Sequence, residues 1–293
     1  MTNSDWTVPS ASTGFRTVAR TYEISVRMAQ AYAAGVGDWN PLYFNDDSPE
    51  GVLAPPCLVY SLQWNARDMP GAPVGTAPPT LYVHAGTDLR FQRPFHAGDV
   101  ITVQGRRIEV TQRPPGVYVV TRFEMRDATG ALVATVDDGA IARGAHTDGP
   151  DVSLEETPPL PHPTGRETDG WSVTFPIARE APHVYTECAD IWNPIHTERR
   201  VALAAGLPDI ILQGSATMAL AARELVNRVA SGDPTRLARL AGQFRAMVIP
   251  GEEIRVACSG VSAGEQGERV AFFEVLNSKA EPAVKGGTAV FRA

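Results

Sequence analysis

The chain has few residues that could bind a metal or form disulfides. Its three cysteines, Cys57, Cys188 and Cys258, are far apart and form no Cys-x-x-Cys pair. Neither a disulfide framework nor a cysteine zinc site is therefore predicted. The six histidines are scattered, and none stands in a metal-ligand spacing such as His-Glu-x-x-His. We expect no metal and no cofactor, and a reducing compartment such as the cytoplasm.

Basic residues and long apolar runs are also scarce. Lys279 and Lys285 are the only lysines, and the net charge is -7, which argues against a nucleic-acid-binding protein. No apolar run reaches the ~18 residues of a membrane span, and residues 1–14 contain no signal-peptide core. With 43% hydrophobic residues, the chain has enough apolar side chains for a packed core. We expect a cytoplasmic protein with no membrane partner.

The sequence contains an internal repeat. Trp-Asn-Pro-Leu-Tyr at 39–43 returns as Trp-Asn-Pro-Ile-His at 192–196, an offset of 153 between the asparagines (193 − 40). Residues 91–99 resemble residues 244–252 with the same offset (244 − 91). An offset this long is outside the ~20–50 residues of solenoid repeats. The chain is therefore predicted to contain two copies of one domain.

The copies are separated by a proline-rich segment. Residues 145–170 hold five prolines and almost no large apolar residue, which predicts an extended linker between domains 1–144 and 171–293. Each copy has an alanine-rich stretch, then a longer helical segment (57–67 and 215–231), then β-branched strands. One buried helix surrounded by an antiparallel sheet is an α+β architecture.

The residues best suited to chemistry lie in the second copy. Asp190 and His196 are six residues apart around the Asn193–Pro194 turn, and Gln213 and Gly214 precede the longer helical segment. An Asp/His pair offers groups for proton transfer. A helix N-terminus offers backbone N–H donors for a developing oxyanion.

This segment resembles the MaoC-like dehydratases, or (R)-specific enoyl-CoA hydratases. Their pattern is approximately Gly-Asp-x-Asn-Pro-Leu/Ile-His, followed by Gly-Phe/Leu-Pro and Ile-Leu-His-Gly. The resemblance extends over nearly the whole chain and implies a tandem double hot-dog fold. It implies reversible hydration of a 2-enoyl thioester, such as a CoA ester, to a (3R)-3-hydroxyacyl thioester. Asp190 and His196 would be catalytic, Gly214 would bind the thioester oxygen, and Asn193 and Gln213 would complete the substrate site.

The second copy departs from that pattern at two positions. The family's Asp and His are five residues apart, a spacing that places Ile191 where Asp is expected. Either a one-residue bulge brings Asp190 into place, or Asp190 caps the turn and the site lacks this carboxylate. Gln213 replaces the histidine that precedes the oxyanion-binding glycine.

The first copy departs further. Asp38 has the expected spacing, but Tyr43 stands where His belongs, and Pro55–Pro56 stands opposite Gln213–Gly214. Because proline has no N–H, Pro56 cannot donate to an oxyanion. We predict a non-catalytic first half that shapes the acyl pocket. A contribution of Asp38 to a mixed site is the alternative.

Two other functions remain open. A hot-dog thioesterase would use the same base and oxyanion site to hydrolyse the thioester. A non-catalytic acyl-CoA-binding or partner subunit would explain the displaced Asp190 and the Gln213 replacement. A homo-oligomer is compatible with each function.

Overall fold

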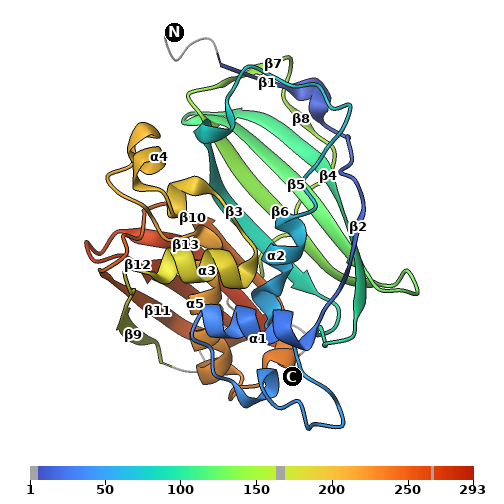
Figure 1. The fold of residues 1–293 in the computed structure, drawn as a ribbon, viewed down its shortest axis with the longest axis vertical. Helices are drawn as coiled ribbons and strands as arrows, with labels where there is room; N and C mark the ends of the chain where they lie inside the picture. Colours follow the sequence, from blue (N-terminus) through green and yellow to red (C-terminus); the bar gives the residue numbers. More distant parts are fainter. Residues whose placement is uncertain (1–5, 163–168, 265–266) are drawn as a thin grey trace.

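The structure is a computed structural model that describes residues 6–162, 169–264 and 267–293. Within these ranges, 11 strands form one antiparallel sheet that curls around two central helices, α2 (Val59–Trp64) and α5 (Gly214–Val229) (Figure 1). Helices α1 (Val26–Gly35) and α3 (Ala181–Ala189) pack against each other. The predicted α+β architecture, with helices surrounded by an antiparallel sheet, is confirmed.

The strands coincide with the segments rich in β-branched and aromatic residues. The first half contains β1 (Thr7–Pro9), β2 (Arg20–Glu23), β3 (Tyr82–Phe91), β4 (Val100–Arg113), β5 (Gly116–Arg126), β6 (Leu132–Arg143), β7 (His146–Asp148) and β8 (Val152–Ser153). The second half contains β9 (Trp171–Pro176), β10 (Leu237–Phe244), β11 (Glu253–Ala263), β12 (Arg269–Leu276) and β13 (Pro282–Phe291), with the short helix α4 (Arg199–Ala204).

The sheet shows that the two copies are related by a pseudo-two-fold axis. Its order is β2-β4-β5-β6-β3 followed by β10-β13-β12-β11-β9, which places equivalent strands at mirrored positions. At the join, β3 and β10 pair Asp88 with Ala241, its own equivalent at the repeat offset (241 − 88 = 153). The hydroxyls of Tyr32 and Tyr185, again 153 apart, lie 3.0 Å from each other. Residues that meet their own equivalents lie on the axis.

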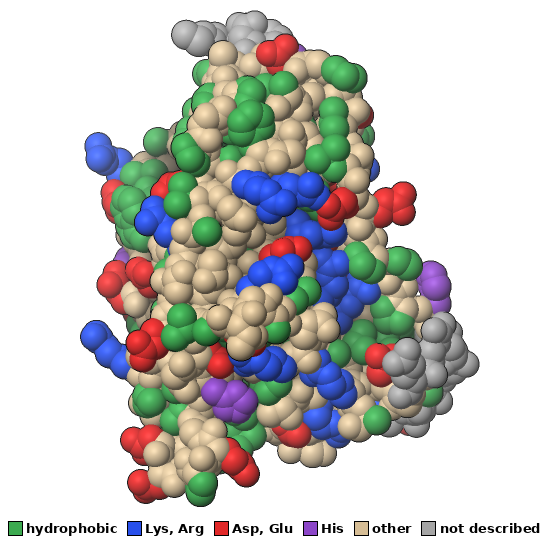
Figure 2. All heavy atoms as spheres, turned by 90° about the vertical axis from the view of Figure 1, so that its right-hand side faces the viewer, with side chains coloured by type: hydrophobic (Ala, Val, Ile, Leu, Met, Phe, Trp, Pro, Cys, Tyr) green, Lys and Arg blue, Asp and Glu red, His purple; other side chains and the backbone are tan. Residues whose placement is uncertain are grey.

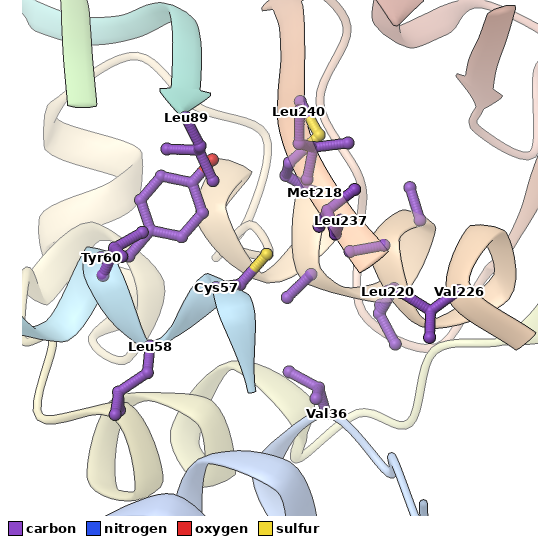
Figure 3. Close-up of a cluster of buried hydrophobic side chains, with 14 of the residues drawn as sticks. Val36, Cys57, Leu58, Tyr60, Leu89, Met218, Leu220, Val226, Leu237 and Leu240 are labelled. Atoms are coloured by element: carbon purple, nitrogen blue, oxygen red, sulfur yellow. The ribbon is translucent and has the colours of Figure 1, made fainter. Parts of the chain in front are cut away.

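The two halves share one hydrophobic core. In Figure 3, Cys57 of the first half lies between Tyr60 and the side chains of Met218 and Leu220 on α5. All four belong to one cluster of buried side chains that draws on both halves. Fully burying a large apolar side chain contributes about 1.5–3 kcal/mol, so neither half keeps its full core alone.

The central helices differ in length. The predicted second helix is confirmed as α5, with 16 residues. The first was predicted over 57–67, but α2 has only six residues and ends at Trp64. Pro70 disfavours helical backbone at the residue before it, and Gly71 adopts a left-handed φ of 75°. The chain leaves the helix earlier still, at Asn65, whose φ of -82° and ψ of 0° are not helical, and continues as irregular backbone to the 3-10 helix that precedes β3.

Part of the predicted linker is ordered and contacts both halves. Strand β7 pairs with β1, and β8 pairs with β4. Beyond them, Glu155 forms ion pairs with Arg106 and Arg122, and the carbonyls of Pro158 and Pro159 accept hydrogen bonds from Arg239. Figure 2 shows basic side chains gathered in a band across one face, on the side of β2 and β4. Linker positions 163–168 lie outside the described residues.

Within residues 6–162, 169–264 and 267–293, no helix combines the length and apolar character needed to cross a membrane.

Candidate active site

A cavity of about 700 Å³ lies between the halves. The second half lines it with residues around His196 and the start of α5, and the first half with residues of α2, β3 and β6. The predicted residues Asn193, His196, Gln213 and Gly214 all line it. The part of the chain that the structure describes holds no cluster of three or more His, Cys, Asp or Glu side chains able to bind a metal ion.

His196 is held as a neutral base. It ends a 3-10 helix (Pro194–His196) whose first turn is capped by the Asn193 side chain, which accepts from the Ile195 N–H at 3.3 Å. Its Nδ1 lies 2.8 Å from the Ile211 carbonyl oxygen. Because a carbonyl only accepts, Nδ1 carries the proton and Nε2 keeps its lone pair. Burial lowers the pKa of His196 to about 4, so the ring is uncharged at neutral pH.

Gly214 is the first residue of α5. The first N–H groups of a helix have no partner within the helix, so the Gly214 N–H is available to an anion in the cavity. Gln213 before it is 2% exposed, and its Nε2 donates to the Pro182 carbonyl at 3.0 Å and to Thr186 Oγ1 at 2.9 Å. Gln213 therefore fixes the start of α5 against α3.

Asp190 is not brought to His196. It ends α3 with a left-handed φ of 52°, and its carboxylate accepts from Asn65 Nδ2 at 2.9 Å. Ile191, which is 4% exposed, lines the cavity instead. Among the described residues that line the cavity, Asp190 is absent.

The register explains why no bulge moves Asp190 inward. The Ile191 N–H donates to the Thr186 carbonyl, and the Asp38 N–H donates to Ala33, the same bond shifted by 153 residues. Gly37, with φ 59°, is thus the equivalent of Asp190. The bulge hypothesis is wrong, because the motif contains no inserted residue: Asp190 lies at the position that Gly37 occupies in the first half.

Among the described residues of the first half, the equivalent position holds a cavity of only about 10 Å³ beside Pro56. Asp38 is 7% exposed, and burial raises its pKa. Tyr43, at the position of His196, is 1% exposed. The Ala54 N–H donates to Phe95 in the way that Leu212 donates to Val248. Pro56 therefore stands where Gly214 stands, as the sequence predicted.

Sequence reasoning missed a polar cluster on the first-half wall of the cavity. Asp138 of β6 lies 2.9 Å from Arg67 NH2 through Oδ2 and 2.9 Å from His84 Nε2 through Oδ1. Gln63 Nε2 is 3.4 Å from the same Oδ1. The His84 ring packs on Phe244 of β10 with centroids 4.3 Å apart. The one available signal was Asp138 itself, an acid in a strand where apolar residues were expected.

Two family models match the chain. The family model described as "MaoC like domain" matches residues 171–281, and "FAS1-like, dehydratase domain region" matches residues 11–136. The chain is 25% identical over 248 residues to 3-hydroxyacyl-thioester dehydratase Y of Mycobacterium tuberculosis, covering 83% of this chain and 84% of that protein.

Solved structures show the same fold. A MaoC-like dehydratase from Phytophthora capsici superposes with a TM-score of 0.78 at 20% identity, covering 96% of each chain. A Mycobacterium tuberculosis protein described as having a double hot-dog fold superposes with a TM-score of 0.62 at 17% identity, covering 95% of each chain.

Two related halves around one shared cavity define the class of double hot-dog proteins. Within that class, the chain belongs to the MaoC-like dehydratase family, as its repeated Trp-Asn-Pro motif predicted.

Proposed function

We propose that the chain is a hydro-lyase that reversibly hydrates a 2-enoyl thioester to a (3R)-3-hydroxyacyl thioester, with CoA as the carrier. The relatives named as 3-hydroxyacyl-thioester dehydratase and enoyl-CoA hydratase support this activity. The observation that carries it is that His196 and Gly214 line one cavity, with His196 held as a neutral base.

The mechanism follows from these two groups. His196 Nε2 takes a proton from water, whose oxygen attacks C3 of the enoyl group. The Gly214 N–H donates to the thioester oxygen, which gains negative charge as the enolate forms. The protonated imidazole then returns its proton to C2, so that the overall reaction adds one water across the C2=C3 bond. Dehydration follows the same steps in reverse.

The other predicted residues have supporting roles in this proposal. Asn193 shapes the turn that presents His196, and Gln213 fixes the start of α5. Because its carboxylate accepts a hydrogen bond from Asn65, Asp190 has no proton-transfer role in this proposal. We propose domain 1–144 as the half that binds the acyl group, 145–170 as the connection, and 171–293 as the catalytic half.

Location and assembly are finer proposals. We propose a cytoplasmic enzyme that acts on acyl-CoA, and a homo-oligomer stays a prediction. Size-exclusion chromatography with light scattering would test the assembly.

The test separates hydration from its alternatives with one substrate. Purified protein mixed with crotonyl-CoA should lower the absorbance of the conjugated enoyl thioester without releasing free thiol. Thiol release that is lost in His196→Ala would favour the thioesterase. Binding of crotonyl-CoA with neither change would favour the non-catalytic subunit. Either of these two results would overturn the proposal.

A further inference from the structure

The first-half wall of the cavity carries a polar cluster at a place where an acyl pocket is expected to be apolar. Along β6, Val136 belongs to the main hydrophobic core, and Asp138 is two residues further along the strand. Residues two apart in a strand share a face, so Asp138 projects to the core side. It is 8% exposed and lines the cavity together with Arg67 and His84.

Asp138 and Arg67 of this cluster form a close ion pair. Although burial raises the pKa of Asp138, the Arg67 guanidinium and the adjacent His84 ring hold it well below its usual range. Asp138 is therefore ionised and neutralised in place by Arg67. A buried ion pair of this kind is weak support for stability, because apolar residues of the same volume often serve as well. Its position on the cavity wall points to a role in binding.

Gln63 shows that the cluster has an unused acceptor. The side chain comes from α2, is 1% exposed and lines the cavity. Its Nε2 faces Asp138, while its Oε1 is buried with no hydrogen-bond partner among the described residues. A buried acceptor left unpaired costs about 1–3 kcal/mol. A ligand group that donates a hydrogen bond would remove this cost.

The neighbouring Arg67 supplies the complementary donors. Its guanidinium has five N–H donors in a planar fork, and one nitrogen, NH2, contacts Asp138. The Arg67 side chain is 38% exposed and lies over the Trp64 ring, 4.3 Å from its centroid. Donors and an acceptor thus stand together on one wall, and the net charge of Arg67 with Asp138 is zero.

We propose that Gln63, Arg67 and the paired His84–Asp138 form a subsite for a hydroxyl group on the acyl chain of the substrate, away from the thioester. The inference rests on the proposed function, since it names the class of enoyl thioester that the site takes. A hydroxyl donates to Gln63 Oε1 and accepts from the Arg67 guanidinium. An alkyl chain leaves the Gln63 oxygen unpaired, and a carboxylate offers it no proton.

The experiment uses three 2-enoyl-CoA substrates at each of several matched chain lengths. One carries a terminal hydroxyl, one a terminal carboxylate and one a terminal methyl group. At the chain length that reaches the subsite, kcat/KM should be at least about tenfold higher for the hydroxylated substrate than for the other two. That factor corresponds to one well-made hydrogen bond of about 1.4 kcal/mol. Equal kcat/KM values at all lengths, or preference for the carboxylate, would overturn the subsite.

Two variants identify the responsible groups. Gln63→Met keeps the volume and removes the acceptor, so the hydroxyl-to-methyl ratio of kcat/KM should fall toward one. Gln104→Met is the matched control, because Gln104 lies on β4 outside the cavity lining and contacts Arg16 and Thr17; it should keep the ratio. His84→Asn should also reduce the ratio. If instead it lowers kcat by the same factor on all three substrates, the pair transfers protons and the subsite assignment is wrong.

Failure of the proposed function has a different signature. In that case the wild-type protein hydrates none of the substrates. Calorimetric titration with saturated hydroxyacyl-CoA and acyl-CoA of equal length then tests the subsite alone. Tighter binding of the hydroxylated ligand, lost in Gln63→Met, would support the subsite, and equal affinities would overturn it.

Discussion

At the scale of single residues, the Asn193–Pro194 turn carries His196 to the cavity wall, while the backbone at Asp190 turns its carboxylate away from it. Asn193 and His196 line the cavity, because the Asn-Pro turn builds its own 3-10 helix. Asp190 does not, because its left-handed backbone directs the carboxylate to Asn65. That partner comes from the other half of the chain, 125 residues away, and no local pattern could indicate it.

His196→Ala should lower kcat by about 10²–10⁴, the usual effect of removing a general acid–base group. Steady-state hydration of crotonyl-CoA checks this. His146→Ala is the control, since His146 is an exposed residue of β7 that does not line the cavity, and it should leave kcat unchanged. An His196→Ala enzyme with near wild-type kcat would remove His196 from the mechanism.

The pH dependence should show the lowered pKa of His196. The base works when unprotonated, so kcat/KM should stay level as pH falls from 8 and decline only near pH 4, where the free enzyme takes up the proton. A decline already centred near pH 6.5 would contradict the burial argument.

Stability should depend on pH through the same group. The unfolded chain protonates His196 near pH 6.5, whereas the folded chain does so only at about 4. Between these two pH values the unfolded state therefore binds more protons than the folded state. The stability that neutral His196 contributes at pH 7 is lost as the pH falls from about 6.5 to about 4. Wild type should lose about 2–3 kcal/mol more than His196→Gln between pH 7 and pH 4, since the ring is partly open to the cavity. Urea unfolding at both pH values measures it, and equal losses would contradict the linkage.

Asp190→Asn should change kcat less than about threefold, because the carboxylate lies outside the cavity lining and an amide can still accept from Asn65. The same crotonyl-CoA assay measures it. A fall of a hundredfold or more would mean that Asp190 moves to the cavity with substrate bound, and would restore it as the catalytic carboxylate.

At the scale of elements, the two halves differ at the start of their central helices. The second half has Gly214 there, with an N–H to donate, and the first half has Pro56, which has none. The β-branched residues predicted the strands, and the longer helical segment over 215–231 predicted α5. The helix α2 is shorter than the sequence predicts, because the chain leaves helical backbone at Asn65, and no proline or glycine at that position indicates it. The cluster on the first-half wall could not be predicted, because α2, β3 and β6 meet only in the folded sheet.

Gly214→Pro tests the oxyanion donor. Proline is accepted at the first position of a helix, as Pro56 shows in the first half, so the fold should remain while the N–H is lost. We expect kcat to fall about 10²–10³-fold, the effect of deleting one oxyanion donor.

Gly214→Ala is its control in the same crotonyl-CoA assay. It keeps the N–H, and its Cβ would lie 3.2 Å from Phe244 Cδ1, so the ring must shift by a few tenths of an ångström. The loss of kcat should be clearly smaller than for proline. Equal losses in both variants would assign the effect to crowding rather than to the donor.

At the scale of the whole molecule, the halves are not independent units. The sheet is continuous through β3 and β10, and one core draws on both halves. The repeat in the sequence predicted two copies but not their relation. The structure adds that residues 153 apart, such as Tyr32 and Tyr185, lie in contact across the pseudo-two-fold axis.

The contact between α1 and α3 tests this axis through stability. Gly35 and Cys188 are repeat equivalents (188 − 35 = 153), and a Cβ on Gly35 would lie 2.6 Å from Cys188 Cβ, which forces the helices apart. Gly35→Ala should therefore lower the free energy of unfolding by about 1–3 kcal/mol, despite the better helix propensity of alanine. Adding Cys188→Gly to Gly35→Ala moves the small residue to the other helix and should recover part of that loss. Urea unfolding of both single variants and the double variant gives the coupling energy, expected at about 1 kcal/mol or more for residues in contact. Additive effects would mean that the helices separate freely here, and that the pseudo-two-fold contact does not hold the halves together.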